Sequence, residues 1–159
     1  MKTILIPFAA ILAALFTGCS QGVECGANCP DIGGLYDVTT IESESTCGFS
    51  GLEPYDSISL NQDASGGGRT TVRDPDLPPE NQAVSVEGRI FVEEGVDPAT
   101  SDVATFSSQF RHTGLNVTVS FSVSGINSGN RRISGSINTS DLSQPPCNVI
   151  RSFAGDIKR

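Results

Sequence analysis

The chain has 159 residues, a formal net charge of −8 and a single histidine. This length matches one ordinary domain. Eighteen acidic residues face ten basic ones, and the longest basic cluster is Arg131-Arg132. The chain would therefore repel a polyanion, and we expect no nucleic acid among its partners.

Residues 1–18 have the order of a signal peptide. Lys2 precedes an apolar run from Ile4 to Phe16, whose thirteen residues fall short of the roughly 20 that a helix needs to cross a bilayer. The run ends in Phe16-Thr17-Gly18-Cys19. The segment therefore predicts export and argues against a permanent transmembrane helix.

These last four residues resemble the lipobox of bacterial lipoproteins, in which an apolar residue and two small residues precede a lipidated cysteine. The resemblance implies cleavage before Cys19 and a diacylglycerol on its thiol, and two acyl chains suffice for stable membrane anchoring. Ser20 stands where an inner-membrane retention signal has Asp, so the resemblance favours the outer membrane of a Gram-negative envelope. The alternative is an ordinary signal peptide that is cleaved nearby and leaves a soluble secreted protein.

Beyond the cysteine, residues 19–30 are short and polar and suit a tether, and the domain is expected at 31–159. Most of the domain alternates apolar and polar residues with period two, as half-buried strands do. The clearest strands are Leu115–Ser124 and Val84–Val92. Weaker strands are expected at Gly34–Cys47, Tyr55–Asp63, Arg69–Arg73, Ser101–His112, Arg131–Thr139 and Cys147–Ile157.

Turn-forming residues separate these segments, and no stretch of ten or more residues has the pattern of an amphipathic helix. About eight short strands, each with one apolar face, indicate an all-β domain formed by a single antiparallel meander. A closed β-barrel of the lipocalin-like kind is favoured over a β-sandwich.

The remaining cysteines form an even set in a chain bound for an oxidising compartment, which favours two disulfides. Three pairings are possible. A zinc site of four cysteines is the alternative, but such sites usually pair their ligands at short spacing, and two of these cysteines are isolated in the sequence. The four residues are Cys25, Cys29, Cys47 and Cys147.

The barrel hypothesis selects one pairing. In a closed meander the first and last strands are antiparallel neighbours, so Cys47 would lie beside Cys147 and the two earlier cysteines would pair with each other. Counting back along both strands then places Ile41 opposite Phe153 on the inner face.

Gly34-Leu35-Tyr36 on the first strand and Arg151 on the last resemble the lipocalin pattern, in which a Gly-x-Trp packs against an arginine from the closing end of the chain. Tyr36 stands in place of the tryptophan. The resemblance implies a barrel in which Tyr36 meets Arg151, and it implies nothing about a ligand.

The sequence offers little catalytic equipment. His112 is expected to be an exposed residue beside the Thr113-Gly114 turn, because no nucleophile motif accompanies it. Asp74 and Asp76 are expected to act in turn formation, and no acidic cluster has the spacing of a calcium loop. We therefore expect no catalytic residue, no metal site, no cofactor and no enzyme activity.

Two functions remain open. The first is a non-catalytic surface, structural or interaction module whose polar outer faces contact an envelope protein or polymer. The alternative is a carrier or sensor with a small lipid-like ligand inside the barrel. An eight-stranded barrel is just wide enough for either its own side chains or one small ligand. Gly88, Gly135 and Gly155 on inward positions would favour a cavity, whereas the phenylalanines would fill it.

Overall fold

The structure, a computed structural model, describes residues 22–143 and 145–158. Cys19 and the predicted signal peptide lie outside this part. The described residues form three short 3-10 helices, η1 (Gly26–Asn28), η2 (Pro79–Asn81) and η3 (Pro98–Thr100), none of them long and apolar enough to span a membrane. The strands are β1 (Val23–Glu24), β2 (Gly34–Ser45), β3 (Ser57–Gln62), β4 (Gly67–Arg73), β5 (Ala83–Val92), β6 (Val103–His112), β7 (Leu115–Ser124), β8 (Arg132–Asp141) and β9 (Cys147–Ile157).

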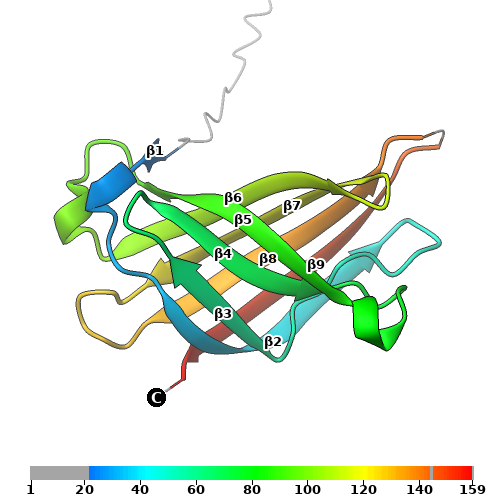
Figure 1. The fold of residues 1–159 in the computed structure, drawn as a ribbon, viewed down its shortest axis with the longest axis horizontal. Coiled ribbons are helices and arrows are strands. Elements are labelled where there is room, and N and C mark those ends of the chain that lie inside the picture. The colour runs from blue at the N-terminus through cyan, green and yellow to red at the C-terminus, as the bar shows by residue number, and fades with distance from the viewer. Residues whose placement is uncertain (1–21, 144, 159) are drawn as a thin grey trace, which may run out of the picture.

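Strands β2 to β9 form a closed antiparallel barrel of eight strands (Figure 1). Each strand pairs with the next along the chain, and the pairing of β2 with β9 joins the first strand of the meander to the last. Closure leaves no strand of the meander as an outer sheet edge, which removes a common site of aggregation. The predicted closed barrel is confirmed.

Three aromatic rings fill the middle of the barrel. Phe106 stacks on Phe121 with the ring centroids 4.8 Å apart, and Phe121 meets Phe153 edge to face at 6.3 Å. All three side chains are at most 1% exposed. Inward glycines make room for them: a Cβ atom on Gly135 would overlap Phe121, and one on Gly88 would lie 2.6 Å from Cζ of Phe106. The Phe106 ring therefore occupies the space beside Gly88, and the Cα and Cβ atoms of Phe121 occupy the space beside Gly135.

β2 changes its inward face at a bulge. The register is regular from Ser45, opposite Val149, to Glu42, opposite Ser152. It shifts by one residue between Glu42 and Thr40, so Thr40 lies opposite Phe153. The expected pairing of Ile41 with Phe153 is therefore wrong, and Ile41 is 67% exposed. A bulge places two residues of one strand against one of its partner, so residues of opposite parity can face the interior on its two sides.

Both predicted disulfides are confirmed. Cys47 and Cys147 join the end of β2 to the start of β9, with a Cα–Cα distance of 5.1 Å. Cys25 and Cys29 close a small loop around η1, with a Cα–Cα distance of 4.9 Å. The first bond lies at one end of the barrel and the second at the other.

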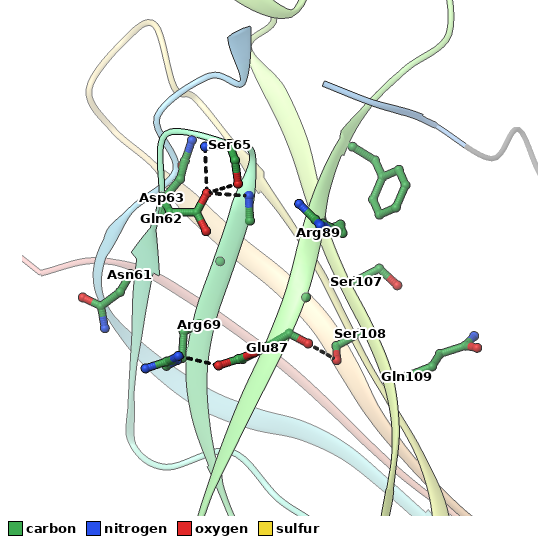
Figure 2. Close-up of a pocket in the computed structure, with 14 residues that line it drawn as sticks. Asn61, Gln62, Asp63, Ser65, Arg69, Glu87, Arg89, Ser107, Ser108 and Gln109 are labelled. Atoms are coloured by element: carbon green, nitrogen blue, oxygen red, sulfur yellow. Dashed lines mark hydrogen bonds and ion pairs between the residues drawn. The ribbon is translucent and has the colours of Figure 1, made fainter. Parts of the chain in front are cut away.

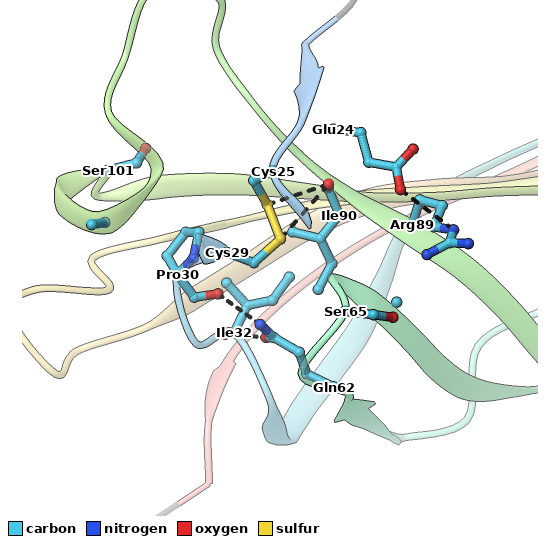
Figure 3. The surroundings of a disulfide bond; sticks show 12 residues. Glu24, Cys25, Cys29, Pro30, Ile32, Gln62, Ser65, Arg89, Ile90 and Ser101 are labelled. Carbon is cyan, nitrogen blue, oxygen red and sulfur yellow. Dashed lines mark hydrogen bonds and ion pairs between the residues drawn. A yellow bond between two sulfur atoms is a disulfide. The ribbon is translucent and has the colours of Figure 1, made fainter. Parts of the chain in front are cut away.

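The described part of the expected tether packs on the barrel. In β1, Val23 lies opposite Val92 of β5. The backbone N–H of Cys25 donates to the carbonyl of Ile90 (3.2 Å), and Cys25 is only 9% exposed. Figure 3 shows the sulfur atoms of Cys25 and Cys29 beside the same carbonyl. The Ile90 N–H in turn donates to the carbonyl of Gly66 in the β3–β4 turn (3.0 Å). β1 and this turn therefore lie along the same edge of β5.

The lipocalin pattern does not hold in its contacts. Arg151 lies opposite Ser43 in β2 and donates to the carbonyl of Ser50 (2.9 Å), away from Tyr36, which lies opposite Ile157. The expectation that Tyr36 meets Arg151 is wrong because Arg151 lies six residues along β9 from Ile157, the residue opposite Tyr36.

A different arginine, Arg131, lies within hydrogen-bonding reach of the Tyr36 hydroxyl. Its guanidinium also donates to the carbonyl of Gly33 (2.9 Å). The Tyr36 hydroxyl donates to the carbonyl of Ile32 (2.7 Å), and Ile32 is fully buried. Burial raises the pKa of Tyr36 above its usual value, and the Arg131 charge opposes part of this rise. These hydrogen bonds hold the segment that follows Cys29 against the barrel, at the end that carries the Cys25–Cys29 disulfide.

Candidate functional site

Two surface grooves of the described chain lie on the outer wall of the barrel, where β5 meets β6. The pairing of these strands is short: Arg89–Phe91 lies opposite Thr105–Ser107. By contrast, β6 pairs with β7 along its whole length, Val103–His112. Just beyond the paired residues, the hydroxyl of Ser108 donates to the backbone carbonyl of Glu87 (2.5 Å). A side chain here supplies a hydrogen bond between the diverging strands.

The first hollow, which we call the polar groove, has a volume of about 790 Å³ and crosses β3, β4, β5 and β6 (Figure 2). Because side chains alternate along a strand, the outward residues of these four strands form most of its floor and walls. Most of them are polar. They include Asn61, Gln62, Asp63, Ser65, Arg69, Glu87, Arg89, Ser107, Ser108 and Gln109.

Ion pairs hold three of the four charged residues that line the polar groove, Arg69, Glu87 and Arg89. Arg69 pairs with Glu87 across β4 and β5, and Nε of Arg89 lies 3.5 Å from Oε1 of Glu24 on β1. All four side chains are about half exposed or more, so each pair contributes at most about 1 kcal/mol to stability. Positive and negative side chains therefore alternate along the groove, so its electrostatic potential is not strongly positive or strongly negative.

Asp63 shapes the β3–β4 turn at one edge of the polar groove. Its Oδ1 accepts hydrogen bonds from the hydroxyl (2.6 Å) and N–H (2.8 Å) of Ser65 and from the N–H of Gly67 (3.1 Å). The Ser65 hydroxyl is the largest cause of a lowered pKa at Asp63, and the two backbone N–H groups add to it. The turn is thus held by a carboxylate.

The second hollow, which we call the apolar groove, has a volume of about 760 Å³ and adjoins the first. Both are lined by Phe91 and Ser107. The apolar groove lies beside β1 and the β5–β6 loop, which share one end of the barrel (Figure 1). Its other lining residues are Gly22, Val92, Glu93, Val96, Ser101, Asp102, Val103, Thr105 and Ser120.

His112 and Asp74 form a contact near the opposite end of the barrel. Nε2 of His112 lies 2.8 Å from Oδ2 of Asp74, and the two side chains are 19% and 7% exposed. His112 flanks the Thr113-Gly114 turn as expected, but the expectation that its side chain is exposed is wrong. Asp74 also accepts from the N–H of Asp76 (3.0 Å), as expected for a turn residue. The pair ties the end of β6 to the β4–β5 loop.

No cluster of three or more metal-ligating side chains occurs among the residues that the structure describes. The four disulfide cysteines stand as two separate pairs at opposite ends of the barrel. This separation rules out a shared zinc site. The predicted lipidation site, Cys19, lies outside the described residues, three positions before Gly22.

Neither groove follows from the strand pattern of the sequence, although one residue, Phe91, carries a signal. Phe91 falls on the polar face of the Val84–Val92 strand, between Arg89 and Glu93. A bulky aromatic among polar outward residues is typical of a contact surface. The short pairing of β5 with β6 left no sign in the sequence, because both strands alternate along their full length.

No family model, no curated protein and no solved structure matches this chain.

Proposed function

We propose that the chain is a non-catalytic lipoprotein of the bacterial cell envelope, anchored through Cys19. Its barrel acts as a rigid scaffold, and its binding surface is the polar groove on the outer wall. The lipobox and the lipidated cysteine it implies support the anchor. Two disulfides suit an exported protein.

The packed interior is the observation that carries this proposal. A carrier needs an apolar void, whereas Phe106, Phe121 and Phe153 fill the middle layer of the barrel and are at most 1% exposed. Stacked rings with the separations seen here contribute about 0.5–1.5 kcal/mol beyond their burial. Opening a ligand site would cost these contacts, so the alternative of a small lipid-like ligand inside the barrel is disfavoured.

The chemistry of the polar groove indicates the kind of partner. Arg69, Glu87 and Arg89 are already in ion pairs, and Asp63 accepts three hydrogen bonds from its own turn. Exposed amides at Asn61 and Gln109 offer both donors and acceptors. Phe91 adds an apolar ring at one side. Such a surface suits an uncharged or mixed-charge partner that forms many hydrogen bonds, as an envelope protein or polymer would.

Site-specific photocrosslinking in the native cell tests the binding surface. A benzophenone amino acid at Gln109 lies in the polar groove, and the same residue at Ser134, exposed on the outer face of β8, is the matched control. We expect a discrete adduct from position 109 and none from position 134. Equal labelling at both positions, or at neither, would contradict a binding role for this groove.

A further inference from the structure

Three exposed valines surround the point where the N-terminal segment reaches the barrel. Val23 on β1 is 51% exposed, Val103 at the start of β6 is 47% exposed, and Val96 in the β5–β6 loop is 37% exposed. Val96 and Val103 line the apolar groove together with Gly22, the residue before Val23. We call Val23, Val96 and Val103 the valine rim. A single exposed valine needs no explanation, but a group around one hollow forms an apolar patch.

The distance from the predicted anchor to this rim is short. Cys19 precedes Gly22 by three residues, and an extended chain spans at most about 3.6 Å per residue, or roughly 10 Å here. The headgroup layer on each side of a bilayer is about 5–8 Å thick. A lipid on Cys19 therefore restrains the barrel end at Gly22 to the surface of the membrane.

We propose that the valine rim and the apolar groove rest in the surface of the lipid bilayer, and that the occupant of the groove is membrane phospholipid. The inference depends on the proposed anchor at Cys19. It fixes the orientation of the molecule, because the end that carries the Cys47–Cys147 disulfide then points away from the membrane. The rim adds an apolar contact to the anchor.

The acidic residues around the valine rim indicate which phospholipid headgroups it contacts. Asp102 and Glu93 line the apolar groove, and Glu94 and Asp97 belong to the same loop. Carboxylates at a membrane surface are repelled by anionic headgroups within about a Debye length. The membrane contact is therefore expected with zwitterionic phospholipid, and phosphatidylcholine vesicles are the appropriate probe.

A tryptophan scan measures this contact directly, because the natural chain contains no tryptophan. Val103→Trp places a single probe on the rim, and Val96→Trp is a second placement in case the first disturbs the fold. Leu142→Trp is the matched control, since Leu142 is 70% exposed and lies on the β8–β9 connection at the opposite end (Figure 1). Each lipidated variant is incorporated into phosphatidylcholine vesicles with brominated acyl chains, which quench tryptophan on contact.

We expect most of the tryptophan fluorescence to be lost at positions 103 and 96 and none to be lost at position 142. Vesicle-bound protein with equal fluorescence at the rim and control positions would overturn the inference while leaving the anchor intact. Full-length protein that carries no lipid on Cys19 and does not float with vesicles would overturn both the anchor and the inference. Flotation thus separates the two failures.

Discussion

At the residue scale, the contact between His112 and Asp74 makes a clear prediction. His112→Ala leaves the Asp74 carboxylate, 7% exposed, without its side-chain partner, and a buried acceptor that loses its partner costs about 1–3 kcal/mol. We expect the free energy of unfolding in urea to fall by this amount. Arg111→Ala, on an exposed neighbouring residue, should change it by less than about 0.5 kcal/mol. Equal stability of the two variants would contradict the role of the pair.

Tyr36 predicts the behaviour of the protein at alkaline pH. Burial raises its pKa in the folded chain above the usual 10.0. The unfolded chain then loses this proton first, so the folded state binds more protons and stability falls as pH rises from about 10 through the raised pKa. Tyr36→Phe removes the titrating hydroxyl. We expect guanidinium unfolding at about pH 8 and pH 10.5 to show a smaller loss of stability in this variant than in the natural chain, and an equal loss would be inconsistent with this account.

The direction of single side chains could be predicted from the sequence where the strand pattern is regular. Phe121 and Phe153 are buried as the alternation requires. The space beside Gly88 and Gly135 could not be predicted, because a glycine has no side chain whose size shows what it faces. Rings on other strands decide whether such a position is empty or filled.

At the element scale, the bulge in β2 separates two residues that a regular count would pair. Ile41→Asp should change stability by less than about 0.5 kcal/mol, because Ile41 is exposed. Phe153→Ala should cost about 3–5 kcal/mol, because it leaves a cavity in the packed interior. Thermal unfolding of the two variants checks both values. A strongly destabilised Ile41→Asp variant would place this residue inside after all.

The strand order could be predicted because strand length, alternation and turn residues agree along the chain. The last strand begins and ends as expected, at Cys147–Ile157, and the Leu115–Ser124 strand does as well. The bulge at Ile41 could not be predicted, because this residue stands alone among polar neighbours and either face suits the pattern. β1 was missed because a strand of two residues has no period to detect.

At the scale of the whole molecule, the Cys47–Cys147 disulfide joins the first and last strands of the barrel. It links residues 100 positions apart, for which the chain-entropy model gives about 4.7 kcal/mol, against roughly 2 kcal/mol for the loop between Cys25 and Cys29. Replacing Cys47 and Cys147 by serine should therefore lower stability more than the same change at the other pair. Urea unfolding of the two double variants measures the difference, and the reverse order would contradict this ranking.

As a whole, the molecule is proposed to carry a lipid on Cys19, and the middle of its barrel is filled by its own side chains. Mass spectrometry of the intact protein from native membranes, before and after delipidation and without reductant, tests both parts in one measurement. We predict a chain that begins at Cys19, carries acyl chains there, lacks the hydrogens of two disulfides and retains no further small molecule. An unmodified Cys19 or a different cleavage site would contradict the anchor, and a retained lipid-like ligand would contradict the filled barrel.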